Sequence, residues 1–196
     1  MNNELKEQII EQINKIPGIS KKQASKIISF FLENKIDYTN DLFQKIITLQ
    51  NETKKCIKCL TYTNQDICKI CEERKRSKKI FVVQDSLNID KFETLDIEKG
   101  KYFVFSENIN LKKIEDKTIE KINLLIENAK DCEELILALN TDLNGQITMR
   151  YLEKQIRDRI KGIKVYQLSI GIPFGMSIES IDPISLKQSI LNKKII

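Results

Sequence analysis

The stretch Cys56-Ile57-Lys58-Cys59, followed after eight residues by Cys68-Lys69-Ile70-Cys71, decides how this chain of 196 residues is organised. Each Cys-x2-Cys pair can place two thiolates on one metal ion from a tight turn. Four thiolates complete the tetrahedral shell of Zn²⁺ and leave no position open for water, as in structural rather than catalytic sites. The spacing therefore predicts a zinc finger over residues 55–72, in which a structural Zn²⁺ is held by Cys56, Cys59, Cys68 and Cys71.

A pair of disulfides is the alternative use of these four cysteines. The start of the chain, Met1–Lys6, lacks the apolar core of a signal peptide, and no run of about 18 apolar residues predicts a membrane span. We therefore expect a cytoplasmic protein without membrane contact, in which thiols stay reduced. The fifth cysteine, Cys132, is expected to be a small buried side chain that fills space in the core rather than a nucleophile, because the chain has no histidine for a catalytic Cys–His pair.

Basic residues are concentrated in the first part of the chain. The net charge is +5, but residues 1–80 carry 16 Lys/Arg against 10 Asp/Glu, whereas residues 81–196 carry 17 against 18. A basic front section on a near-neutral body indicates a polyanionic partner such as nucleic acid. The alternative is a composition that is rich in lysine throughout.

The N-terminal part reads as two helices joined by a Pro-Gly turn. Apolar residues recur at helical spacing over 4–14, Pro17 and Gly18 then end the helix, and Ser20 is a candidate N-cap for a second helix over 21–33. This is a helix-hairpin-helix pattern, whose free turn amides can donate to phosphates. An ordinary helical hairpin with solvated lysines is the alternative. The candidate DNA-binding residues after the turn are Lys21, Lys22 and Lys26.

A third helix is expected over residues 40–53 and leads into the cysteine block. After that block, the run Glu72–Lys79 is rich in basic residues; it could line a nucleic-acid surface or form a solvated connector, and both interpretations stay open. The apolar residues of the third helix that should face inward are Leu42, Phe43, Ile46, Ile47 and Leu49.

From Ile80 onward, short apolar strands alternate with helices. Strands that are apolar throughout are typical of buried parallel strands, and the alternation predicts a mostly parallel sheet covered on both faces. A rigid loop at 171–175 and a final helix capped by Asp182 and started by Pro183 should end the chain. The expected strands are 80–83, 102–105, 135–139 and 164–168, and the expected helices between them are 88–95, 118–129 and 145–160.

Several stretches, in this order, carry a resemblance to a known family. They are the cysteine block at 56–71, Leu-Ile-Leu-Ala-Leu-Asn at 135–140, Gly-Ile-Pro-Phe-Gly at 171–175 and Ser-Leu-Lys-Gln-Ser-Ile-Leu at 185–191. Together with the Pro-Gly helical pair, they resemble the bacterial recombination-repair RecR family. The resemblance implies a multidomain α and α/β chain: a helix-hairpin-helix domain (1–54), the four-cysteine zinc finger (55–72), a Toprim-type mostly parallel α/β domain (79–169) and a C-terminal loop and helix (170–196).

The resemblance also implies a function. RecR proteins form ring-like homo-oligomers around DNA, so a tetrameric ring is expected here. They act with RecO, and in many bacteria RecF, to load RecA at single-stranded gaps. The family's two DNA-contacting basic residues fall on Lys22 and Lys26, although the second is arginine in the family, and Ser20 stands where a second turn glycine is usual.

Catalytic Toprim proteins hold Mg²⁺ with a glutamate after the first strand and an Asp-x-Asp after a later one. Here the first position is Gln84, and the pair reads Asn140-Thr141-Asp142, so we expect no enzymatic activity. One alternative is a Mg²⁺-dependent Toprim nuclease or primase relative that uses Asp142 with Asp85. Another is a monomeric, zinc-stapled nucleic-acid adaptor.

Overall fold

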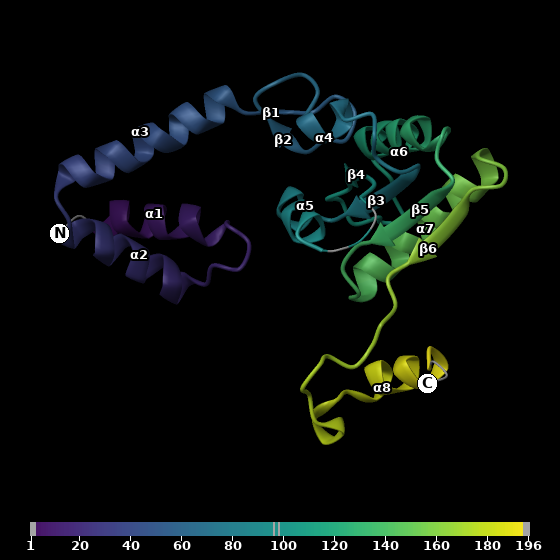
Figure 1. Cartoon of the computed structure of the whole chain (residues 1–196). Helices are drawn as coiled ribbons and strands as arrows, with labels where there is room; N and C mark the ends of the chain where they lie inside the picture. The colour runs from purple at the N-terminus through teal and green to yellow at the C-terminus, as the bar shows by residue number, and fades with distance from the viewer. Residues whose placement is uncertain (1–2, 96, 98, 194–196) are drawn as a thin grey trace. The chain divides into compact units, whose positions relative to one another are not determined.

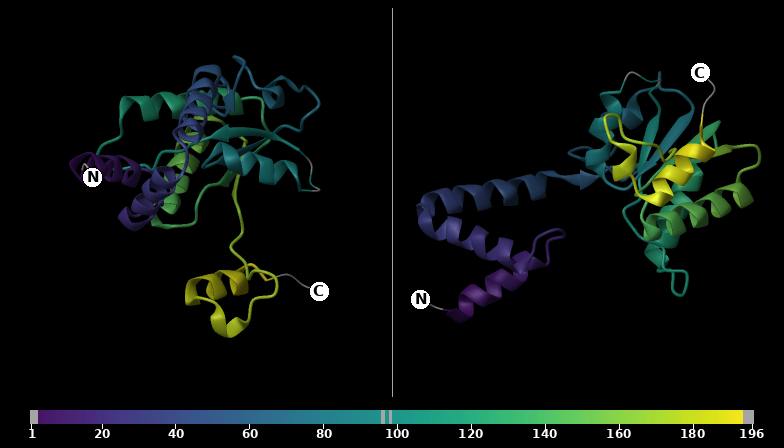
Figure 2. Two further views of the ribbon diagram at one scale, coloured as in Figure 1. Left: turned by 90° about the vertical axis from the view of Figure 1, so that its left-hand side faces the viewer. Right: turned by 90° about the horizontal axis from the view of Figure 1, so that it is seen from below.

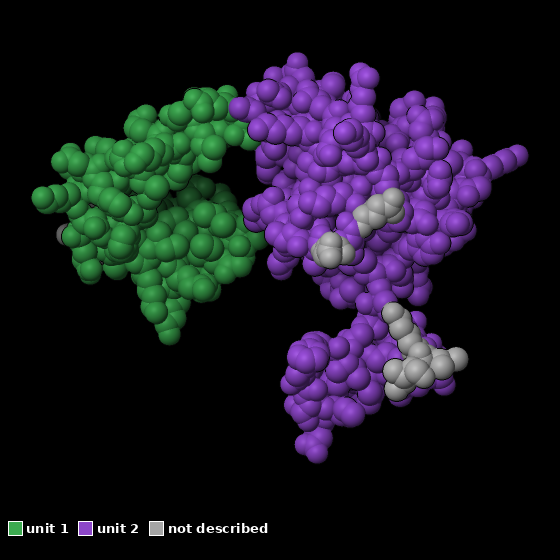
Figure 3. Space-filling model, viewed as in Figure 1, with its two compact units in different colours: residues 1–53 green, residues 54–196 purple. Residues whose placement is uncertain are grey.

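The chain divides into two compact units, residues 1–53 and residues 54–196 (Figure 3). The computed structural model describes residues 3–95, 97 and 99–193. The domain limits expected above remain predictions. Within the described ranges, no helix is both long and apolar enough to cross a membrane.

The first unit consists of helices α1 (Asn3–Asn14), α2 (Lys21–Glu33) and α3 (Ile36–Glu52). Helices α1 and α2 lie side by side (Figures 1 and 2) and share a small core of Ile10, Ala24 and Ile28. The expected N-cap at Ser20 is confirmed: its hydroxyl accepts a hydrogen bond from the Gln23 amide, and the Gln23 side chain accepts one from the Ser20 amide.

The prediction for the third helix is wrong in two respects. Helix α3 begins at Ile36 rather than at residue 40, and none of its residues is buried. Helical periodicity reports that one face is apolar, but it does not show which surface covers that face. Here α1 and α2 cover each other, so α3 touches α2 mainly through ring contacts such as Phe31–Phe43, at 5.8 Å between centroids. The exposed residues of the expected inner face are Phe43 (50%), Ile46 (49%), Ile47 (46%) and Leu49 (65%).

The second unit is built on a four-stranded sheet in which every pairing is parallel and the order is β4-β3-β5-β6 (Figure 1). The strands are β3 (Lys79–Val83), β4 (Lys101–Val104), β5 (Glu134–Ala138) and β6 (Lys164–Gln167). Each lies within one residue of its expected position, and the predicted parallel sheet is confirmed.

Helices cover both faces of this sheet. Helices α6 (Asp116–Ala129) and α7 (Leu143–Arg159) pack on the larger core, while α5 (Ser86–Glu93) packs on the other face. Alternate residues of one strand point to opposite faces, so Ile80 and Val82 of β3 enter the first core while Phe81 and Val83 enter the second. Both cores therefore depend on β3, the central strand next to β4.

The C-terminal segment has no core of its own. It contains a 3₁₀ turn, η1 (Ile178–Ser180), and helix α8 (Pro183–Leu191), which starts at the expected Asp182 cap and Pro183. No residue from 164 to 193 is buried. The loop residue Phe174 is fully exposed, and Ile184 is 72% exposed.

Helix α7 begins against the end of β5 so closely that only glycine fits at position 145. A Cβ atom there would lie 1.8 Å from the Asn140 carbonyl oxygen. Glycine-to-alanine changes inside a helix normally stabilise by about 1 kcal/mol. Overpacking costs about 1–3 kcal/mol, so we expect Gly145→Ala to lower the free energy of unfolding by up to about 2 kcal/mol despite that gain. Urea denaturation of the two variants Gly145→Ala and Gly171→Ala tests this, because a Cβ at Gly171 meets nothing within 4 Å. Equal stabilities would contradict the close approach.

Candidate metal centre and nucleic-acid interface

The four cysteines of the two Cys-x2-Cys pairs come together as predicted. Their sulfur atoms all lie within 4.8 Å of one another, and all four side chains are buried. The Cys59 and Cys68 sulfurs are 3.5 Å apart, and the Cys68 amide donates to the Cys56 sulfur. All five cysteines are free thiols, so the disulfide alternative is not realised. The cluster can hold one metal ion, and four soft sulfur donors suit Zn²⁺.

Neighbouring groups shift the pKa values of these thiols in opposite directions. A hydrogen bond from Cys59 lowers the pKa of Cys71 to about 6, and the same hydrogen bond raises the pKa of Cys59. Burial raises the pKa of Cys68 to about 11. Neighbouring groups thus favour the thiolate form of Cys71 and the neutral form of Cys59 and Cys68. A divalent cation supplies the positive charge that the other thiols need in order to ionise.

The loop between the first two cysteines, residues 56–60, packs onto the edge of the large sheet, and we call it the knuckle. The Val104 amide of β4 donates to the Cys59 carbonyl at 2.8 Å. Leu60 has a positive φ of 64° and packs against both sheet cores. Strands β1 (Lys54–Lys55) and β2 (Tyr62–Thr63) and the short helix α4 (Lys69–Glu72) complete this region. The metal centre therefore covers the edge of β4.

The basic run after the metal centre is fixed by Arg76. The Arg76 side chain, only 7% exposed, donates to both carboxylate oxygens of Glu93 at 2.7 and 2.9 Å, to the Gly100 carbonyl and to Glu73. Tyr102 also donates to Glu93, and the Arg76 hydrogen bonds are the main reason that the pKa of Glu93 falls to about 2. The run is therefore not a freely solvated connector.

The candidate DNA-binding lysines lie on the exposed side of α2, in its first two turns. Lys21, Lys22 and Lys26 are all exposed. The first backbone amides of a helix have no partner within it, and in the described part of the chain no acceptor pairs with the amides of Lys21 and Lys22. Gly18 supplies the positive φ (+83°) of the turn. This helix start offers both charge and free donors to an anion.

The carboxyl ends of the strands hold few acids: Asp85 and Asp142, which follow β3 and β5, serve as helix caps, and Glu107, which follows β4, pairs with Lys121. The Asp85 side chain accepts from the Leu87 amide at the start of α5, and Asp142 accepts from the Gly145 amide at 2.7 Å at the start of α7. Gln84 donates to the Ser106 carbonyl. Among the described residues, no group of three or more potential metal ligands lies at these strand ends.

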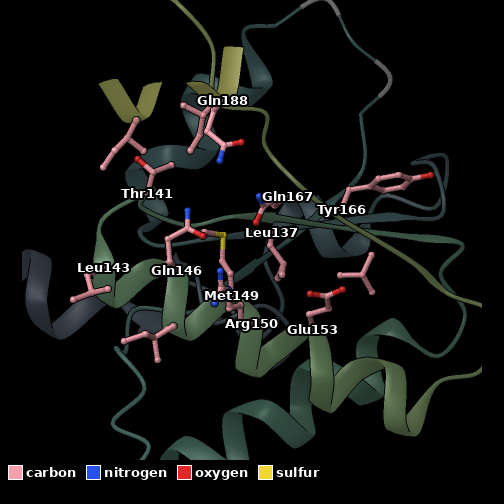
Figure 4. A pocket seen from close by; sticks show the side chains of 14 residues that line it. Leu137, Thr141, Leu143, Gln146, Met149, Arg150, Glu153, Tyr166, Gln167 and Gln188 are labelled. Carbon is pink, nitrogen blue, oxygen red and sulfur yellow. The ribbon is translucent and has the colours of Figure 1, made fainter. Parts of the chain in front are cut away.

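A cavity of about 750 Å³ lies beside β6 and α7, with amide side chains around it (Figure 4). Its polar lining comes mostly from Gln146, Arg150, Gln167 and Gln188, and its one carboxylate is Glu153. A lining of this kind suits uncharged hydrogen-bonding groups better than Mg²⁺. Sequence reasoning missed this cavity, because its residues come from separate segments with no common spacing.

Comparisons with known proteins find relatives over nearly the whole chain. The chain is 33% identical to the "Recombination protein RecR" of Mycoplasmopsis pulmonis over 194 residues, which is 99% of this chain and 100% of that one. This chain belongs to the RecR family. It is also 31% identical to the RecR protein of Aquifex aeolicus, over 94% of this chain and 89% of that one, and 30% identical to that of Bdellovibrio bacteriovorus, over 95% of each. The family profile "RecR, C-terminal" matches residues 171–194.

The cysteine cluster makes a prediction about metal content. The purified protein should contain one zinc ion per chain by native mass spectrometry, and Cys68→Ser should lose it and unfold at a lower temperature. The reason is that metal binding to a structural site contributes directly to folding, by about 10–16 kcal/mol in finger peptides. Cys132→Ser is the matched control, since Cys132 lies outside the cluster. Equal loss of metal from both variants would contradict the assignment of ligands.

Proposed function

We propose that this RecR-family protein is a DNA-binding recombination mediator without enzymatic activity. In this proposal it acts in the cytoplasm as a ring-forming clamp with RecO and, where it is present, RecF, and it promotes RecA loading at single-stranded gaps. The observation that carries the proposal is the near full-length similarity to proteins named "Recombination protein RecR". Its α1–α2 pair is the helix-hairpin-helix element, its parallel sheet is the Toprim domain, and its cysteine cluster holds a structural Zn²⁺.

DNA contact is proposed at the start of α2. Exposed Lys22 and Lys26, with Lys21 beside them, supply charge, and the open amides at the helix start supply hydrogen-bond donors. Such contacts read phosphate groups rather than base edges. Binding through this site is therefore independent of sequence and weak for a single copy, and a ring of copies multiplies it.

Self-association is supported by apolar surface that one chain leaves uncovered. Helix α3 buries no residue, yet it carries large apolar side chains over most of its length. The C-terminal segment repeats this pattern, with Phe174 and Ile184 exposed. Exposed apolar surface of this extent marks interaction sites. A second copy of the chain is the partner that we propose for both.

The proposal that the protein has no enzymatic activity is supported by the side chains at the carboxyl ends of the strands. Asp85 and Asp142 already accept backbone hydrogen bonds as helix caps, and Glu107 after β4 is paired with Lys121. Gln84 and Asn140 stand where catalytic relatives would present acids, and amides neither ionise nor neutralise Mg²⁺. Nicking or primer synthesis by the pure protein with Mg²⁺, lost in Asp142→Ala, would overturn this part of the proposal.

The double variant Lys22→Ala/Lys26→Ala tests DNA contact. We expect its affinity for DNA of any sequence to fall about tenfold or more at 0.1 M salt, and the slope of log K against log salt to become shallower by about 0.7–0.9 per lost phosphate contact. Fluorescence anisotropy over a salt series measures both. Lys112→Ala/Lys113→Ala removes the same charge from an exposed loop of the second unit and should change little. Unchanged affinity in the first variant would remove α2 from the proposed interface.

The apolar face of α3 makes a prediction about assembly. The wild-type protein should have a mass of several chains by light scattering, and Ile46→Glu should lower it, because a charge buried at an interface is costly without a partner. Thr48→Glu places the same charge on another side of α3 and should leave the mass unchanged. A monomeric wild-type protein would contradict the ring and favour the zinc-stapled adaptor.

A further inference from the structure

The basic run after the metal centre borders a cleft of the second unit. The cleft has a volume of about 380 Å³, and cations reach it from three separate segments. Lys58 comes from the knuckle, Arg74 and Lys78 come from the run, and Lys101 comes from the start of β4. Cations that are far apart in the sequence therefore form one positively charged site in the folded chain.

The walls of this cleft are held in place before any ligand arrives. Buried Arg76 pins the run to Glu93 and the Gly100 carbonyl, and the Ser77 amide donates to the Lys99 carbonyl at 3.1 Å. On the other side, the Asn128 side chain donates to the Lys58 carbonyl at 2.9 Å and so ties the knuckle to α6. A site whose groups are already positioned loses less conformational entropy on binding.

Several cations of the cleft are available to a ligand. Lys58 and Arg74 are exposed, and neither forms an ion pair with any residue in the described ranges. Lys78 pairs with Glu133 at 3.3 Å, but both side chains are about 70% exposed, so a stronger anion can replace this contact. Two acids, Glu127 and Asp131, also line the cleft. Glu127 pairs with Lys130, and the single negative charge of Asp131 leaves part of the positive charge of the cleft uncompensated.

Lys101 has a different role. It lines the cleft together with the metal ligand Cys71. Four thiolates around Zn²⁺ carry a net charge of about −2, and a half-buried ammonium next to them compensates part of it. We therefore assign Lys101 to the metal centre and leave Lys58, Arg74 and Lys78 for a ligand.

We propose that this cleft binds a backbone phosphate of DNA and is a second nucleic-acid contact, separate from the start of α2. The proposal rests on the DNA-binding function proposed above. Arginine presents a fork of donors that matches phosphate oxygens, and Lys58 adds a mobile point charge. The lining has one aromatic residue, Tyr102, which is 3% exposed and bonded to Glu93, so no ring is available for base stacking. The contact therefore reads phosphate and not sequence.

The test compares two charge-matched double variants of the full-length, zinc-loaded protein. Lys58→Gln/Arg74→Gln removes two cleft cations but leaves Arg76 and Lys101 intact; Lys112→Gln/Lys113→Gln removes two exposed cations elsewhere. Anisotropy with labelled single-stranded DNA should show about tenfold or more weaker binding for the cleft variant at 0.1 M salt and a salt slope shallower by about 1.4, from two lost single-strand contacts. The control variant should match the wild type. Zinc content and circular dichroism confirm that both variants are folded.

The possible outcomes separate this inference from the function on which it rests. Equal affinities of the cleft and control variants, with weaker binding by Lys22→Ala/Lys26→Ala, would overturn the cleft alone. A wild-type protein that binds no DNA would overturn both proposals. Titration with inorganic phosphate distinguishes the two possible sources of the ligand. If the wild type binds phosphate and the cleft variant does not, while both bind DNA with the same affinity, the cleft is a site for free phosphate. That result would also overturn the proposed DNA contact.

Discussion

The hydrogen bond from the Val104 amide to the Cys59 carbonyl couples the metal centre to the sheet. A parallel sheet leaves unpaired amides and carbonyls along its outer strands, and proteins must cover or otherwise protect them. Here the knuckle covers β4, and Leu60 enters both cores from the same point. The conformation of the knuckle depends in turn on four thiols that require a cation to come together as thiolates. In the zinc-bound state that we propose, metal binding is therefore coupled to the protection of this sheet edge and to core packing.

The sheet of the second unit is covered at one edge only. The edge of β4 is covered, but the strand at the other edge, β6, has no buried residue, and neither has the C-terminal segment that follows it up to residue 193. The first unit shows the same incompleteness at α3. A folded core combined with uncovered apolar elements is expected of a subunit whose remaining contacts come from further copies, which supports the self-association that we propose.

The sequence predicted the elements with strong local signals. Four cysteines with fixed spacing, the capping residues Ser20 and Asp182, and the apolar strands were all placed correctly to within a residue or so. The exposure of the apolar face of α3 could not be predicted, because helical periodicity identifies an apolar face but not the surface that covers it. The cap roles of Asp85 and Asp142 are local, two and three residues from the amides they accept, and sequence reasoning missed them because it considered these residues as metal ligands. The cleft beside Arg76 depends on contacts between segments far apart in sequence, for which spacing carries no signal.

The coupling of the metal to the sheet edge can be measured at two adjacent amides of one strand region. The Val104 amide donates to the knuckle, whereas the Phe105 amide donates to the Val83 carbonyl within the sheet. Hydrogen exchange by NMR, before and after zinc is removed with a chelator, compares them directly. Exchange at Val104 should accelerate far more than exchange at Phe105 if the metal holds the knuckle on β4. Equal protection of Val104 with and without zinc would show that the edge is held by packing alone.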